Sequence, residues 1–300
     1  MTNLPSKVDI HNLIEFLRII SWEAADIFIH YSQILKESAY NKNIMINSNE
    51  DDPVTKVDLK VNELIIKRIN DKYKNVNWGI LSEENTKISR DPSIRKFDWL
   101  WILDPLDGTK DFIQGTGNYA MHLALNYKNK TFLGIVLIPE MNQLWISDGQ
   151  KIWGEQRDGS RLQINLGSVK ELENMTIVTS KNHKNKILKN ILNKINFKKS
   201  ISMGSIGCKV ASIIRGESDI YLSLSLPGKS SPKDWDFAAP EAILRAAGGA
   251  ITDLNNQRLI YNQENFEQKG FIIASKDKHN HGEICLQLKK LIEENDLYDI

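Results

Sequence analysis

The stretch Trp99-Leu100-Trp101-Ile102-Leu103-Asp104-Pro105-Leu106-Asp107-Gly108-Thr109 carries the strongest signal in the chain. Its apolar first half is typical of a buried strand. The proline and the glycine that follow favour a bend at the strand end, which would turn both aspartates toward one point. Converging acidic oxygens suit a hard divalent cation such as Mg²⁺. A surface turn uses the same residue types, so the stretch alone leaves both interpretations open.

Gly108 and Thr109 add groups that an anion can use. Their backbone N–H groups and the threonine hydroxyl follow directly after the two aspartates. Exposed N–H groups in a tight turn or at a helix start can bind an anion. The stretch therefore predicts an anion beside the cation.

Composition narrows the classes of protein. The 300 residues contain 39 Lys and Arg against 38 Asp and Glu, so no global field attracts nucleic acid or a membrane surface. The two cysteines, Cys208 and Cys285, favour a reducing compartment without a disulfide framework. The sequence has no leader pattern and no apolar run near the ~20 residues of a membrane span. We expect a cytoplasmic protein that binds neither nucleic acid nor membranes.

Hydrophobic periodicity gives the first half of the chain an α+β character. Apolar residues at every third or fourth position predict helices over 10–28 and from about Asp58 to 69. Short β-rich runs separated by turn residues then predict antiparallel strands. These runs are 119–126, 131–138, 144–147, 151–155 and 161–164.

The pattern changes near residue 168, after which strands alternate with helices. The predicted strands are 175–179, 201–203, 219–224 and 271–274, and the predicted helices are 184–195, 207–215, 237–247 and 282–293. Such alternation is typical of α/β structure. We therefore predict an N-terminal α+β subdomain over 1–168, which carries most of the metal ligands, and a C-terminal α/β subdomain over 169–300. A cleft between two subdomains is a common small-molecule site.

Acidic residues recur at predicted strand ends and helix starts. They are Asp52 to Asp58, the pair Glu83-Glu84, Asp104 with Asp107, and Asp236. Gathered carboxylates repel one another unless a cation neutralises them, so their joint occurrence favours a metal cluster. Each also has a plainer interpretation, because Asp58 and Asp236 would serve as helix N-caps and Glu83-Glu84 as a solvated loop.

These stretches resemble the signatures of the inositol monophosphatase superfamily, whose members are Mg²⁺-dependent, lithium-sensitive phosphatases. Residues 104–115 resemble the first motif of that superfamily, and 235–244 resemble the second, which closes on Ala247-Gly248-Gly249. The resemblance covers nearly the whole chain. It implies a layered α/β/α/β/α sandwich, with an antiparallel sheet in the first half and a mixed sheet in the second. Ser82 departs from the pattern, since the family usually has glycine there.

Within that superfamily the chain most resembles the 3′(2′),5′-bisphosphate nucleotidases. The stretch 179–183 resembles the one that places a histidine, here His183, near the nucleotide. The stretch 204–209, which contains Ser205, resembles the segment whose lysine, here Lys209, meets the non-scissile phosphate. The loop 226–229 resembles the one beside the base. In the plainer interpretation, His183 and Lys209 are surface residues.

The resemblance also implies a role for each site residue. The ligands of the Mg²⁺ ions, about two or three per site, would be Glu83, Asp104, the Leu106 carbonyl, Asp107 and Asp236. Thr109, supported by Asp58, would orient and deprotonate the attacking water. The substrate contacts would be Gly108, Thr109, His183, Ser205, Lys209 and Asp236. No covalent phosphoenzyme is implied, because the aspartate spacing differs from the Asp-x-Asp-x-Thr of haloacid-dehalogenase phosphatases.

The implied reaction is hydrolysis of 3′-phosphoadenosine 5′-phosphate to AMP and phosphate, in sulfur assimilation, by a monomer or homodimer. One alternative is an inositol or sugar-phosphate monophosphatase with the same fold. His183 and Lys209 discriminate here, since a monophosphate needs no contact for a second phosphate. Another alternative is a catalytically silent nucleotide-binding protein, which would bind nucleotide without Mg²⁺-dependent phosphate release.

Overall fold

The computed structural model describes residues 4–37, 45–47, 54–88, 91–181 and 186–295. The apolar stretch 99–103 lies inside β4 (Trp99–Asp107), in a seven-stranded sheet of order β3-β4-β5-β6-β7-β8-β9. The other strands are β3 (Gly79–Ser82), β5 (Ala120–Tyr127), β6 (Lys130–Ile138), β7 (Gln143–Ser147), β8 (Ile152–Glu155) and β9 (Arg161–Leu162). The strands from β4 to β9 pair antiparallel, as predicted, whereas β3 adds a parallel edge.

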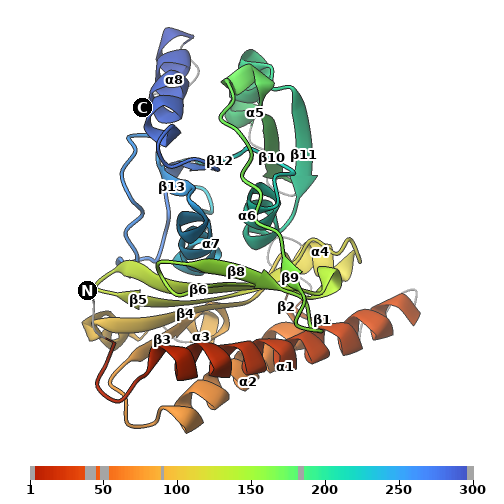
Figure 1. Cartoon of the computed structure of the whole chain (residues 1–300), viewed down its shortest axis with the longest axis vertical. Helices are drawn as coiled ribbons and strands as arrows, with labels where there is room; N and C mark the ends of the chain where they lie inside the picture. Colours follow the sequence, from red (N-terminus) through yellow and green to blue (C-terminus); the bar gives the residue numbers. More distant parts are fainter. Residues whose placement is uncertain (1–3, 38–44, 48–53, 89–90, 182–185, 296–300) are drawn as a thin grey trace.

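Two helices cover one face of this sheet (Figure 1). They are α1 (Ile10–Glu37) and α2 (Lys56–Lys72), which confirm and extend the predicted helices. Trp101 and Leu103 of β4 pack in one buried cluster with both helices. Successive strand residues point to opposite faces, so Leu100 and Ile102 pack in a different cluster. Asp104 shares the face of Leu100 and Ile102, away from α1 and α2.

The second sheet is mixed, as the resemblance implied. Its order is β11-β10-β12-β14-β13, with β10 parallel to β11 and β12 and the other pairs antiparallel. The strands are β10 (Thr176–Ser180), β11 (Lys199–Met203), β12 (Ile220–Ser225), β13 (Ala250–Asp253) and β14 (Gly270–Ser275). Helices α5 (Lys186–Ile195) and α8 (His281–Glu294) cover its outer face.

Helices α6 (Ile206–Ile214) and α7 (Asp234–Ala247) lie between the two sheets (Figure 1). One buried cluster joins these helices to both sheets, with Val136 from β6, Ala239 from α7 and Ile272 from β14. The α/β/α/β/α layering is therefore confirmed. The predicted boundary at 168 falls between β9 and β10. A division into two subdomains stays a prediction, because α6 and α7 bury faces of both sheets.

Short elements complete the described part of the chain. They are β1 (Met45–Asn47), β2 (Val54–Thr55), α3 (Glu83–Ile88) and α4 (Thr109–Ile113). Helices α3 and α4 start directly after β3 and at the end of β4. The acidic stretches of the sequence therefore meet where strands of the first sheet end and where α6 and α7 begin.

Candidate active site

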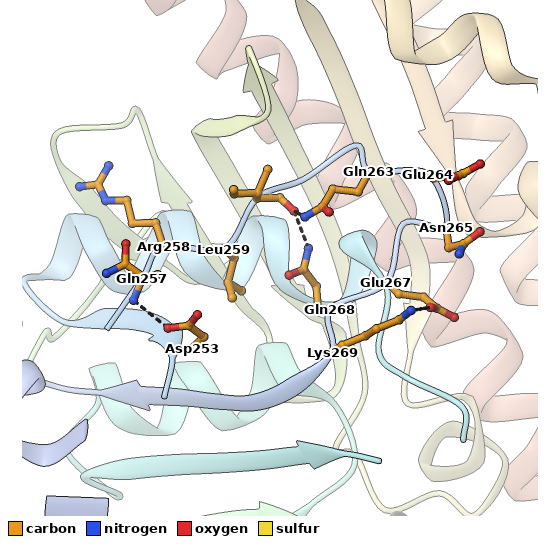
Figure 2. Close-up of a pocket in the computed structure, with 11 residues that line it drawn as sticks. Asp253, Gln257, Arg258, Leu259, Gln263, Glu264, Asn265, Glu267, Gln268 and Lys269 are labelled. Atoms are coloured by element: carbon orange, nitrogen blue, oxygen red, sulfur yellow. Dashed lines mark hydrogen bonds and ion pairs between the residues drawn. The ribbon is translucent and has the colours of Figure 1, made fainter. Parts of the chain in front are cut away.

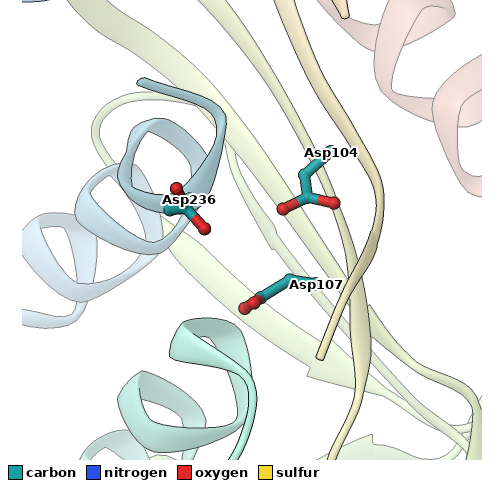
Figure 3. Close-up of side chains that lie close together, drawn as sticks. All are labelled: Asp104, Asp107 and Asp236. Carbon is teal, nitrogen blue, oxygen red and sulfur yellow. The ribbon is translucent and has the colours of Figure 1, made fainter. Parts of the chain in front are cut away.

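Three aspartates converge where β4 ends beside the first turn of α7. Asp104, Asp107 and Asp236 each offer a carboxylate oxygen, and these atoms lie within 4.8 Å of one another (Figure 3). Burial raises the pKa of Asp104 well above its usual range, and the charges of Glu83, Asp107 and Asp236 raise it further. Burial, followed by the charge of Asp107, likewise raises the pKa of Asp236. Such a set of hard, mutually repelling oxygens fits a divalent cation.

Backbone contacts hold each of these carboxylates in place. Asp104 Oδ1 accepts a hydrogen bond from the N–H of Leu106 at 3.0 Å, across the turn at Pro105. Asp236, at the third position of α7, accepts the N–H of Lys233 at 2.5 Å. An aspartate in the first helical turn satisfies N–H groups that lack an intrahelical acceptor. The N-cap of α7 is Lys233, so the interpretation of Asp236 as the N-cap is wrong, while its predicted role as a metal ligand stays a prediction.

Asp107 is anchored by the N-terminus of α6. Its Oδ2 accepts hydrogen bonds from the Ser205 hydroxyl at 2.7 Å and from the N–H groups of Ile206 at 2.5 Å and Gly207 at 3.4 Å. Ser205 is the N-cap of α6 and also accepts the N–H of Cys208 at 3.2 Å. The structure therefore joins Ser205 to a predicted metal ligand, while its predicted contact with substrate stays a prediction.

Glu83 opens helix α3 beside Asp104, whose pKa it raises. Lys87 lies 2.9 Å from Glu83 Oε1 and 3.1 Å from Glu84 Oε1, and Glu84 is buried. The interpretation of this pair as a solvated loop is therefore wrong. Ser82, which departs from the family pattern, donates a hydrogen bond to Asn62 Oδ1 at 2.5 Å and so ties the end of β3 to α2.

Asp58 lies behind Thr109 at the start of α2. The N-cap of α2 is Thr55, whose N–H and hydroxyl both bond to Asp58 Oδ2, at 2.8 Å and 2.5 Å. The hydroxyl of Thr109 lies 3.4 Å from Asp58 Oδ1 and 3.1 Å from the Leu106 carbonyl oxygen. Burial raises the pKa of Asp58 to about 7, with smaller contributions from the charges of Glu84 and Glu83. The contact with Thr109 and the raised pKa fit the predicted support of Thr109 by Asp58, whose catalytic role stays a prediction.

Gly108 has the left-handed backbone conformation that the turn after Asp107 requires. Its φ is +89°, and it is the N-cap of α4. A Cβ at this position would lie 3.0 Å from the carbonyl oxygen of Asn118. The glycine therefore allows Thr109 to follow the aspartates directly as the first residue of a helix.

Lys209 is buried in α6, so the interpretation of this residue as exposed is wrong. Its ammonium group donates to the Gly204 carbonyl at 2.6 Å and lies 5.2 Å from the ring centroid of Tyr221. Burial lowers the pKa of Lys209, whereas the nearby carboxylate of Asp107 opposes that shift. His183 lies outside the described residues. The predicted contacts of both residues with substrate stay predictions.

Two buried polar residues at the site were not identified from the sequence as functional residues. His122 of β5 has Nδ1 3.3 Å from the Trp235 carbonyl oxygen and Nε2 3.4 Å from Asp107 Oδ2. Asp111 of α4 accepts the Thr116 hydroxyl at 2.5 Å. Asp111 lies within the first motif, but His122 lies in an apolar strand. Only its pairing opposite Asp104 in the β4–β5 register would have identified it.

A separate cavity of about 360 Å³ lies beside the loop from β13 to β14 (Figure 2). Its lining includes Arg258, Glu267, Gln268 and Lys269, and it contains none of the three clustered aspartates. Gln268 also donates to Asp234 Oδ1 at 2.7 Å, next to the start of α7. The mixed charges of this cavity select no ligand class, so we assign the candidate site to the acidic cluster.

Curated relatives match most of the chain. A 3′(2′),5′-bisphosphate nucleotidase CysQ of Buchnera aphidicola is 30% identical over 247 residues, which are 79% of this chain and 86% of the relative. The protein of the same name from Escherichia coli K12 is 29% identical over 235 residues, which are 77% of this chain and 88% of the relative.

None of the helices in the described part of the chain combines the length and the hydropathy of a membrane span.

Solved structures share the fold at low sequence identity. An inositol monophosphatase of Thermotoga maritima has a TM-score of 0.71 at 20% identity, and covers 94% of this chain and 99% of its own. CysQ of Bacteroides thetaiotaomicron has a TM-score of 0.66 at 23% identity, and covers 85% of this chain and 94% of its own. The inositol monophosphatase family matches residues 11–293. With both signature motifs at one acidic cluster, the chain belongs to the inositol monophosphatase family.

Proposed function

We propose that the protein is a Mg²⁺-dependent 3′(2′),5′-bisphosphate nucleotidase, which hydrolyses the 3′-phosphate of 3′-phosphoadenosine 5′-phosphate to give AMP and phosphate. The observation that carries the proposal is the convergence of Asp104, Asp107 and Asp236 within 4.8 Å beside Thr109 and Asp58. The substrate class comes from relatives of that name at about 30% identity. A role in sulfur assimilation would follow from that substrate.

The residues that would hold the cations are Glu83, Asp104, the Leu106 carbonyl, Asp107 and Asp236. The donors fit Mg²⁺ because all of them are oxygens and because burial and mutual repulsion leave Asp104 and Asp236 in need of positive charge. Bound divalent cations neutralise phosphate charge and lower the pKa of water from about 16 toward ~7. About two or three ions per site are proposed, as the family resemblance implies, and two-metal sites are a common arrangement for in-line displacement at phosphorus.

The protein's own groups would orient and deprotonate the attacking water. The Thr109 hydroxyl, 3.1 Å from Leu106 O and 3.4 Å from Asp58 Oδ1, would turn from the Leu106 carbonyl to Asp58, give its own proton to that carboxylate and take one from the attacking water. A carboxylate with a pKa of about 7 is a suitable base at neutral pH. The water oxygen bonds to phosphorus as the bond from phosphorus to the 3′-oxygen breaks, and that oxygen takes a proton from solvent. Gly108 and Thr109 would hold the scissile phosphate.

An inositol or sugar-phosphate monophosphatase is the second candidate. The likeness of the fold to the Thermotoga maritima inositol monophosphatase, with a TM-score of 0.71, favours it. The buried ammonium group of Lys209 favours a bisphosphate instead, since this group donates to the Gly204 carbonyl near Asp107 and Asp236 and adds positive charge there.

We further propose a cytoplasmic location, which the free, buried Cys208 and Cys285 support. A monomer or homodimer stays a prediction.

Phosphate release tests the proposal. Wild-type protein with Mg²⁺ is given 3′-phosphoadenosine 5′-phosphate or inositol 1-phosphate side by side, and Asp107→Asn measures contamination by other phosphatases. We expect a strong preference for the nucleotide. A preference for inositol 1-phosphate would keep the metal chemistry and overturn the substrate. Nucleotide binding without phosphate release from either compound would identify a silent binding protein.

Lys209→Met tests the contribution of this lysine to substrate selection. We expect the variant to raise KM for 3′-phosphoadenosine 5′-phosphate more than KM for 3′-AMP, which has no second phosphate. An equal change for both compounds would show that Lys209 acts on the site as a whole and not on the second phosphate.

A further inference from the structure

His122 occupies the face of the first sheet that carries the acidic cluster. In the β4–β5 register it lies directly opposite Asp104. Residues opposite one another in an antiparallel pair point to the same face. The His122 side chain therefore lies behind the cluster, between β5 and the helices α6 and α7, and it is fully buried.

Both ring nitrogens of His122 face groups that belong to the candidate metal site. Nδ1 lies 3.3 Å from the carbonyl oxygen of Trp235, the residue that directly precedes Asp236. Nε2 lies 3.4 Å from Oδ2 of Asp107 without forming a hydrogen bond. Burial lowers the pKa of His122, and a neutral ring has one N–H, so it donates to one of these two acceptors and packs against the other. One imidazole thus spans the gap between the end of β4 and the first turn of α7, which supply separate ligands of the cluster.

The packing around the ring fixes its position. Gly207, in the first turn of α6, approaches so closely that a Cβ there would lie 2.3 Å from His122 Nε2. The same first turn donates backbone hydrogen bonds to Asp107 Oδ2. The ring of His122, the N-terminus of α6 and Asp107 therefore form one packed unit.

We propose that His122 is a positioning residue for the cation site, which holds Asp107 and the Asp236 turn at the spacing that a divalent cation requires. The proposal rests on the cation site of the proposed function and adds a residue to it. Groups that contact metal ligands from behind fix the ligand orientation, and their loss typically weakens metal affinity or activity by about 10–100-fold. His122 touches neither substrate nor cation in this role.

The chain offers a matched control in His281. It is a second buried histidine, and each of its ring nitrogens has a hydroxyl partner, Ser275 Oγ at 2.7 Å from Nδ1 and Thr252 Oγ1 at 2.8 Å from Nε2. It lies at the start of α8, against the second sheet. Replacement of His281 should therefore disturb a core to a similar extent without a direct effect on Asp107 or Asp236.

The test compares His122→Phe, His122→Asn, His122→Gln and His281→Phe. Mn²⁺ serves as the probe and is titrated into the metal-free, full-length protein by calorimetry, with free Mn²⁺ also followed by paramagnetic resonance. The melting temperature of each metal-free variant is measured in parallel. An asparagine amide can replace the Nδ1 contact with Trp235, and a glutamine amide can replace the Nε2 contact with Asp107.

We expect His122→Phe to weaken Mn²⁺ binding by about 10–100-fold and the two amides to recover part of that loss. His281→Phe should lower the melting temperature and keep the Mn²⁺ affinity. Wild-type affinity in His122→Phe would overturn the proposal, as would an equal loss in His281→Phe or no recovery by either amide. Wild-type protein that binds Mn²⁺ but releases no phosphate from nucleotide would overturn the proposed function and leave this inference standing.

Discussion

Removal of one charge from the acidic cluster should stabilise the metal-free protein while it abolishes metal-dependent activity. Asp104→Asn is the most informative change, because Asp104 is buried and has a pKa raised by burial and by Glu83, Asp107 and Asp236. A carboxyl whose pKa is raised on folding stabilises the protein below its unfolded pKa, and that contribution is lost as pH rises through the folded pKa. Above the unfolded pKa, Asp104 therefore opposes folding until a cation binds.

The geometry sets the size of this effect. Two unit charges at the 4.8 Å limit of the cluster repel by about 1 kcal/mol in a water-like dielectric and by ~3 kcal/mol at an effective dielectric constant near 20. Asparagine keeps an oxygen that can accept the Leu106 N–H at 3.0 Å. We therefore expect Asp104→Asn to raise the free energy of unfolding of the metal-free protein by about 2 kcal/mol.

Urea unfolding in EDTA and in Mg²⁺ measures this difference. A ligand that binds only the folded state stabilises it, so Mg²⁺ should stabilise the wild type more than Asp104→Asn. Asp219→Asn is the control, and we expect it to lower the free energy of unfolding. Lys170 and Lys276 contact this buried carboxylate, and its pKa is lowered. The reasoning is refuted if Asp104→Asn destabilises the EDTA-treated protein as Asp219→Asn does.

Three further predictions concern the base, the turn and the pH dependence of stability. Asp58→Asn should reduce kcat by about 10²–10⁴-fold with little change in Mn²⁺ affinity, and an unchanged kcat in a steady-state assay would exclude Asp58 as the base. Gly108→Ala, at a φ of +89°, should cost about 1–3 kcal/mol in urea unfolding and lower kcat; a wild-type unfolding curve would contradict this. Burial lowers the pKa of His281 from 6.5 to about 4, so the unfolded chain takes up the proton first. The free energy of unfolding should thus fall by up to ~3 kcal/mol from pH 6.5 to 4. If the free energy of unfolding of His281→Phe falls as steeply over this range, another group causes the decrease.

The sequence predicted most of the fold because the strong periodic patterns are local. The apolar stretch 99–103 and the amphipathic helix from residue 10 give the right element types on their own. The strand β13 was not predicted, because its four residues are too short for a periodic pattern and become a strand only through pairing with β14. The parallel edge strand β3 likewise depends on a distant neighbour.

The part of the candidate site that depends on neighbouring residues in the sequence was predicted, and the part that depends on tertiary packing was predicted only in part. Asp104 and Asp107 are close in sequence and at a strand end, so local geometry brings them together. The convergence of Asp236 with them depends on the way α7 packs against the first sheet, and it was anticipated only from the recurrence of acidic residues at predicted element ends and from the family resemblance. The burial of Lys209 and the position of His122 are tertiary effects, set by α6 packing onto Tyr221 and by the pairing of β4 with β5.

Crystals grown with Mn²⁺ and inorganic phosphate test the central claim most directly, because manganese is located by its anomalous scattering. The account predicts anomalous peaks among the carboxylates of Asp104, Asp107 and Asp236, with phosphate at the turn formed by Gly108 and Thr109. Manganese peaks only elsewhere on the protein, with these three carboxylates free of metal, would contradict it.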